Sequence, residues 1–204
     1  MGAITAEQTE WAVVDRLRSM LAEPQGEFTT TQSFALFSSI VCWVMQHARV
    51  KLGDQHTATD RAAAELHRLL EQESASDNPW HICSQPAGRI GGRGIRIPAP
   101  VGFETHTAAR LLKNLRDAMA HGDARTVQPF NRGHLLVGFV FLCSEKNRKG
   151  ELLWSGSLVL LESDMRRIGC ALAERYCQTI QAANETPEGL RFEDAAASIT
   201  EAAA

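Results

Sequence analysis

Apolar residues recur every three to four positions in five stretches of the chain, and this spacing constrains the fold more than any other feature. It places apolar side chains on one face of an α-helix, where they can be buried against other helices. We therefore expect five helices, at roughly 6–21, 32–51, 59–72, 105–121 and 164–182. The second has the widest apolar stripe and is expected at the centre of a helical bundle.

Before the last helix, the period changes from 3.6 residues to about two. The segments HLLVGFVFLC (134–143) and LLWSGSLVLLE (152–162) are separated by a polar turn, which is typical of a β-hairpin. The predicted fold is mainly α, an up-down bundle of about five helices with a β-hairpin (134–162) inserted before the last helix. The hairpin can complete the core, cover a cleft or present an edge to a partner.

Residues 74–104 have no periodicity and contain several glycines and prolines, so we predict a long loop. Long loops in compact domains are often functional. A glycine-rich loop can cradle phosphate, although this one lacks the ending of a P-loop. Trp80 and Phe103 flank it and serve either as core anchors or as stacking surfaces for RNA bases. We expect a single domain over 1–183 and a mobile tail over 184–204.

Charge is distributed unevenly along a chain whose formal net charge is -3. Residues 86–132 contain eight basic and three acidic residues, a net charge of +5, which leaves -8 for the remainder. A local basic region in an acidic protein fits an anionic ligand better than general coating of DNA. A solvated basic loop is the alternative.

Cysteine usage and the N-terminus indicate a soluble cytoplasmic protein. The five cysteines are odd in number and widely spaced, with no CxxC pair, which argues against a disulfide framework and a zinc site. The first ten residues lack the basic and apolar regions of a signal peptide. The most apolar stretch, 34–45, is about half the ~20 residues that span a bilayer. We expect no membrane association, metal or cofactor.

The end of the fourth predicted helix combines two residues suited to phosphodiester chemistry. His121 can accept or donate a proton near neutral pH, because an imidazole has a pKa near ~6.5. Arg116 stays charged and can bind two phosphate oxygens with its planar guanidinium. The structural alternative is a histidine that interacts with the helix dipole and a solvated arginine.

The run Arg116–His121 (RDAMAH) resembles the Arg–x4–His signature of HEPN domains, with Asp117 at the polar position after the arginine. The flanking segments LLKNLRDAMAHGDARTVQPFN, LVGFVF and WSGSLVLLESDMRRIG resemble a small plasmid- and genome-encoded HEPN family with an extended "AHGDAR…PFN" block. The resemblance covers roughly 100–176. It implies a HEPN-like bundle and a metal-independent endoribonuclease, in which the ribose 2′-OH attacks the adjacent phosphate to leave a 2′,3′-cyclic phosphate and a 5′-OH.

Helix geometry separates the two catalytic candidates. Five helical residues correspond to a rotation of about 140° and a rise of ~7.5 Å, so Arg116 and His121 point in different directions on one ideal helix. Either His121 reaches its partner through a frayed helix end, or a second subunit completes the site. Because HEPN domains form composite sites at dimer interfaces, the resemblance implies a homodimer with a shared cleft.

Other residues near the motif are candidates for supporting roles. Asp117 can orient an imidazole or pair with Lys113, and Asp123 and Arg125 can contact phosphate or be solvated loop residues. Asn131 can hydrogen-bond around the site or cap a turn. The candidate RNA contacts are Arg89, Arg93, Arg96 and Lys113.

Two classes of function follow. The first is an RNA-cleaving toxin or defence effector, with an antitoxin or nucleotidyltransferase as a potential partner. The second is a non-catalytic HEPN module that binds nucleotide or RNA, or mediates dimerisation. The presence of both Arg116 and His121 favours the nuclease.

Overall fold

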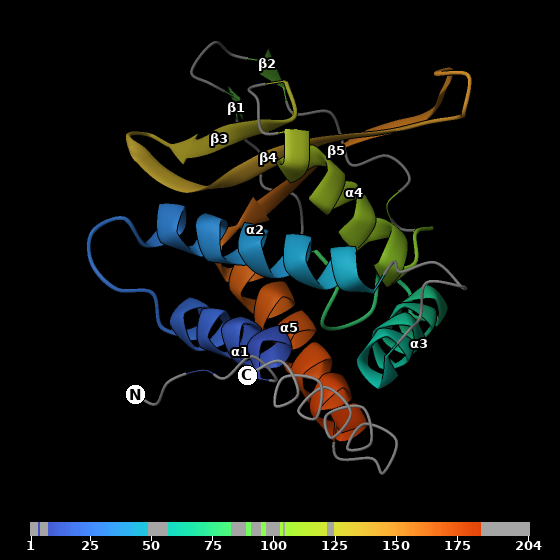
Figure 1. Cartoon of the computed structure of the whole chain (residues 1–204). Helices are drawn as coiled ribbons and strands as arrows, with labels where there is room; N and C mark the ends of the chain where they lie inside the picture. The colour runs from blue at the N-terminus through green and yellow to red at the C-terminus, as the bar shows by residue number, and fades with distance from the viewer. Residues whose placement is uncertain are drawn as a thin grey trace, which may run out of the picture.

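Five helices form where the apolar spacing predicts them (Figure 1). The computed structural model describes residues 4, 8–48, 57–82, 89–90, 95–96, 103, 105–121 and 125–184, with the backbone alone at 89, 90, 95, 96 and 121. The helices are α1 (Thr9–Ala22), α2 (Thr29–His47), α3 (Ala58–Gln72), α4 (Ala108–His121) and α5 (Glu162–Asn184). Beyond Asn184, the expected tail lies outside the described residues.

The prediction of a mainly α fold with one inserted hairpin is wrong, because the strands form a larger sheet and the structure is mixed α and β. The five strands are antiparallel and lie in the order β2-β1-β3-β4-β5. The predicted hairpin is formed by β4 (Leu135–Lys146) and β5 (Leu152–Leu161). The unpredicted strands are β1 (Arg89–Ile90), β2 (Ile95–Arg96) and β3 (Val127–Arg132).

Local sequence explains why these three strands are missed. Two strands of only two residues cannot show a period, and both lie in the segment expected to be a loop. Strand β3 contains Pro129, and proline within an apolar run argues against a central strand because it cannot donate to the ladder. Among the described residues, β1 pairs with β3 at Phe130 and not at Pro129, so this side of the ladder asks for no donor from the proline.

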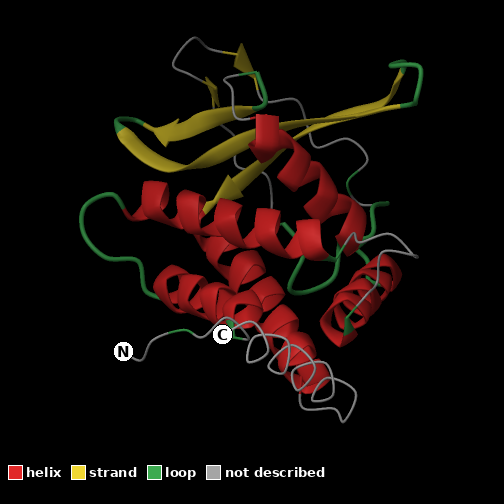
Figure 2. Cartoon of the chain, in the orientation of Figure 1, coloured by secondary structure: helices red, strands yellow, loops and turns green. Residues whose placement is uncertain are grey.

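The helices lie on one side of the sheet in two layers (Figure 2). Helices α2 and α4 contact β4, and α5 lies beyond α2 with α1 and α3 packed against it. Phe34 of α2 stacks on Phe139 of β4, with ring centroids 4.2 Å apart. The sheet face thus supports α4, the helix that carries the Arg116–His121 motif.

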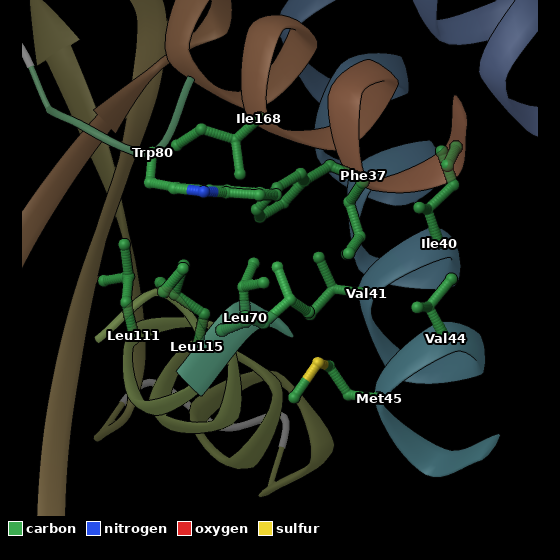
Figure 3. Close-up of a cluster of buried hydrophobic side chains, with 14 of the residues drawn as sticks. Phe37, Ile40, Val41, Val44, Met45, Leu70, Trp80, Leu111, Leu115 and Ile168 are labelled. Carbon is green, nitrogen blue, oxygen red and sulfur yellow. The ribbon is translucent and has the colours of Figure 1, made fainter. Parts of the chain in front are cut away.

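The core includes Trp80 and Phe103, the two aromatic residues for which the sequence allowed either a core position or stacking on RNA bases. Trp80 is fully buried and lies among Phe37, Leu70 and Ile168 (Figure 3). Phe103 is also buried and packs edge-on against Trp154. Neither ring is accessible for base stacking, so the core-anchor interpretation is correct for both.

Candidate functional site

The sequence of α4 produces one apolar and one polar face. Its apolar residues recur at helical spacing and are buried in the core, and they comprise Ala108, Leu111, Leu112, Leu115 and Ala118. The polar face carries Arg110, Lys113 and Asp117, which are part-buried between α3 and β4. The helix is therefore anchored by its apolar face and presents a row of charged groups beside the sheet.

The Arg116 side chain is held in place by two partners. Its Nη1 donates to Asp117 Oδ1 over 2.7 Å, and its Nη2 donates to Gln46 Oε1 of α2 over 2.6 Å. The side chain is 25% exposed. Because a guanidinium has five N–H donors, three lack a partner among the described residues. Arg116 is thus oriented, accessible to a ligand and still able to bind an anion.

Asp117 joins the two cations of this face. Its Oδ2 accepts from Lys113 Nζ over 2.9 Å, while its Oδ1 accepts from Arg116. Burial raises the pKa of Asp117, but hydrogen bonds from Lys113 and Arg116 outweigh it and lower the pKa below its usual value. Asp117 is therefore ionised at neutral pH. Of the two roles left open by the sequence, the pairing with Lys113 is present in the structure.

His121 is the last residue of α4, and its side chain lies outside the described part of the structure. Asp123 and Arg93 also lie outside the described residues. Arg89 and Arg96 are described as backbone only and are cross-strand partners in β1 and β2. Asn131 is exposed on β3.

A cavity of about 1110 Å³ lies beside the polar face of α4. Helix α3 and strand β4 complete its walls, and its lining includes Lys113, Asp117 and Arg125. The structure thus brings together three residues that the sequence singled out. Arg116 and Asn131 are outside this lining, although Arg116 reaches it indirectly through Asp117.

Glu145 and Asn114 also line the cavity and were not among the predicted site residues. Arg110 donates to Glu145 through Nε (2.9 Å) and Nη2 (2.7 Å), and Asn114 Nδ2 donates to the same carboxylate over 2.9 Å. A polar residue between Leu111 and Ala118 on the apolar stripe was the only sequence signal for Asn114. Glu145 had no such signal, because its partners lie about 30 residues away.

The titration of the cavity residues limits their chemistry. Hydrogen bonds from Arg110, foremost, lower the pKa of Glu145 to about 2, so this carboxylate is ionised and does not serve as an acid near neutral pH. Burial raises the pKa of the Cys143 thiol to about 12, which leaves it protonated and a poor nucleophile. Glu145 thus contributes a fixed negative charge to the cavity, and Cys143 contributes none.

No family model, curated protein or solved structure matches this chain. The HEPN resemblance therefore depends on the motif and its flanking sequence. Among the described residues, no helix is long and apolar enough to cross a membrane.

Proposed function

We propose that the protein is a metal-independent endoribonuclease in which Arg116 and His121 act on the scissile phosphodiester. The observation that carries this proposal is the state of Arg116, which is oriented by Asp117 and Gln46 and keeps three N–H donors without a described partner. Such a group can bind two phosphate oxygens without reorganising. The HEPN resemblance supplies His121 as the proton-transfer group.

The reaction is an internal transfer. The 2′-OH oxygen forms a bond to phosphorus while the bond from phosphorus to the 5′-oxygen breaks. Either His121 takes the 2′-OH proton and water protonates the leaving 5′-oxygen, or water takes the 2′-OH proton and His121 protonates the leaving oxygen. Arg116 stabilises the negative charge on the pentavalent phosphorus. The products are a 2′,3′-cyclic phosphate and a 5′-OH, so the step requires no further reactant.

The proposal includes a homodimer in which the two groups of one site come from different subunits. The separation of about 140° between positions five apart on a helix supports this arrangement, since Arg116 and His121 lie at such positions on α4. We further propose a cytoplasmic toxin or defence effector, with an antitoxin or nucleotidyltransferase as its partner.

The test is cleavage of labelled RNA in EDTA by the wild type, Arg116→Ala and His121→Ala. Loss of a proton-transfer group lowers a rate by about 10²–10⁴-fold, and loss of a charge-stabilising donor by about 10²–10³-fold. Arg68→Ala and His134→Ala are matched controls, because Arg68 is about half exposed and paired only with Glu65 among described residues, and His134 is exposed. Both controls should cleave like the wild type.

Mixed dimers test the composite site. Arg116→Ala subunits mixed with His121→Ala subunits should regain activity, because one site of each mixed dimer combines an intact arginine with an intact histidine. Cleavage that survives both substitutions, or a pure wild type that does not cleave, would contradict the nuclease. An active monomer in sedimentation would contradict the dimer.

A second candidate is an RNA- or nucleotide-binding module without catalysis. It is favoured by the contact between Arg116 and Asp117, which offsets much of the charge that a transition state would need. Binding of RNA by a wild type that does not cleave it would select this candidate.

A further inference from the structure

Trp43 of α2 is the most exposed of the four tryptophans, all of which lie in the described part of the chain. It is 39% exposed, whereas Trp80 is fully buried, and Trp11 and Trp154 pack partly buried against the core. Tryptophans are highly buried on average in folded proteins. The Trp43 indole is thus the one that a ligand can reach most easily.

A hydrogen-bond network holds one edge of the Trp43 ring. Its indole N–H donates to the hydroxyl of Tyr176 on α5, and Tyr176 is fully buried. The same hydroxyl lies 2.7 Å from His47 Nδ1, and His47 Nε2 lies 3.3 Å from Asp60 Oδ1 on α3. A tryptophan can in this way bond its N–H inside the protein while the rest of the ring faces water. The exposed part of the ring is therefore preorganised, so a ligand that packs on it orders little more of the protein.

Trp43 is close to the guanidinium that is proposed to bind the scissile phosphate. Gln46 follows Trp43 by three residues on α2, which makes the two side chains neighbours on the helix surface, with Cβ atoms about 5–6 Å apart. Gln46 Oε1 in turn accepts from Arg116 Nη2 over 2.6 Å. A single side chain therefore links the exposed indole to Arg116.

The surface of α2 beside Trp43 is open and uncharged. Helix α2 contains no lysine, arginine, aspartate or glutamate. The positions four and eight residues before Trp43 are Ser39 and Ala35, which are exposed and too small to cover an indole. Asp117, the carboxylate beside Arg116, is also bonded to Lys113. No charged side chain of α2 thus repels a polyanion from the ring.

An exposed aromatic ring near a phosphate-binding arginine suits single-stranded RNA. Every base has a π-face, so stacking on an aromatic side chain tolerates any sequence, and proteins that bind single strands combine such rings with cations. The bases of a single strand are free to stack on a protein because they are not paired. Arg116 keeps three N–H donors without a described partner for the phosphate of such a strand.

We infer that Trp43 is a stacking platform for the RNA base next to the scissile phosphate, with Arg116 binding that phosphate. The inference rests on the proposed function for RNA as the ligand. It adds a contact from α2, a different helix from the one that carries the Arg–x4–His motif. Trp43 takes no part in proton transfer and determines where the strand lies.

The experiment measures binding of two fluorescein-labelled 12-mers to the full chain by fluorescence anisotropy. One is oligoadenylate with 2′-O-methyl riboses, which prevent cleavage, and the other is an abasic strand of equal length and charge. Loss of one base–aromatic stack weakens binding by about 5- to 150-fold. We expect a loss in this range for Trp43→Ala with oligoadenylate and no change with the abasic strand. Trp43→Phe keeps a ring and should retain most of the affinity.

Two further variants separate stacking from phosphate binding. Phe28→Ala is the matched control, because Phe28 is an aromatic residue, 75% exposed, at the start of the same helix and about 22 Å from Trp43 along its axis. It should bind like the wild type. Arg116→Ala should reduce the salt slope of binding by about 0.7, the value for one phosphate contact on a single strand, whereas Trp43→Ala should leave the slope unchanged.

The outcomes are distinct. Equal affinity of the wild type and Trp43→Ala for oligoadenylate, or an equal loss for the abasic strand, overturns the platform. Dissociation of Trp43→Ala in sedimentation with unchanged affinity for oligoadenylate also overturns it and identifies the ring as a contact between two copies of the chain. Cleavage of unmodified RNA at an unchanged rate and affinity in Trp43→Ala rejects the platform alone. Binding that depends on Trp43 without cleavage supports the platform and rejects the nuclease.

Discussion

Replacing Glu145 with glutamine should destabilise the protein at neutral pH and change its response to acid. Glu145 connects β4 to α4, because its carboxylate accepts two hydrogen bonds from Arg110 and one from Asn114. Glutamine has nearly the same size but no charge, and its amide nitrogen would meet the Arg110 guanidinium as a second donor. The substitution therefore tests the charge of this contact without opening a cavity.

The lowered pKa of Glu145 gives the size of the expected loss in the free energy of unfolding. Hydrogen bonds from Arg110, the largest cause, and from Asn114 lower it from 4.5 to about 2, and each pKa unit corresponds to about 1.4 kcal/mol. The ionised Glu145 carboxylate therefore stabilises the folded chain by at most about 3 kcal/mol. The Arg110 side chain is 42% exposed, against 18% for Glu145, so solvent screens the pair. We expect Glu145→Gln to lower the free energy of unfolding by about 1–2 kcal/mol at pH 7.

The sign of the pH dependence follows from the lowered pKa. Above pH 4.5 the carboxylate is ionised in both folded and unfolded chains, and its stabilisation is complete. As the pH falls from 4.5 towards 2, the unfolded chain binds a proton before the folded one does, and the stabilisation is lost. The difference between wild type and Glu145→Gln should be constant from pH 7 to 5 and shrink below pH 4.5.

Urea unfolding followed by far-ultraviolet circular dichroism at pH 7, 5, 4 and 3 measures this difference. Glu65→Gln is the matched control, because Glu65 also pairs with an arginine, Arg68, but both side chains are about half exposed. The control should not differ measurably from the wild type at any pH. A loss for Glu145→Gln no larger than for Glu65→Gln, or one that stays constant down to pH 3, would refute the reasoning.

Two further substitutions test the support of the site and of the sheet. Gln46→Ala removes a contact that orients Arg116, so RNA cleavage should slow by about tenfold with an unchanged circular dichroism spectrum; an unchanged initial rate would contradict a positioning role. Gly138→Ala would place a Cβ 2.2 Å from the Leu160 backbone oxygen, and overpacking of about 1–3 kcal/mol should lower the melting temperature by several degrees. Ser144→Ala, at an exposed position of the same strand, should melt like the wild type, and equal melting of the two variants would argue against the close contact.

The helices and the hairpin could be predicted from the sequence because their signals are local. Apolar residues three or four positions apart indicate each helix. Alternation of apolar and polar residues on both sides of a polar turn indicates the hairpin. The polar face of α4 follows from the same spacing, as does the pairing of Lys113 with Asp117 one turn later. These features depend on residues within a few positions of one another.

The extent of the sheet and the hydrogen-bond partners of the site residues depend on the tertiary structure. Strand β3 forms because each of its residues pairs with β4, a partner that the local sequence around Pro129 does not indicate. The contact from Arg116 to Gln46 spans 70 positions, and that from Arg110 to Glu145 spans 35. No local period encodes such pairs, because they form only when α2, α4 and β4 pack together. The sequence thus determined which residues α4 displays, and packing determined which of them share a cavity.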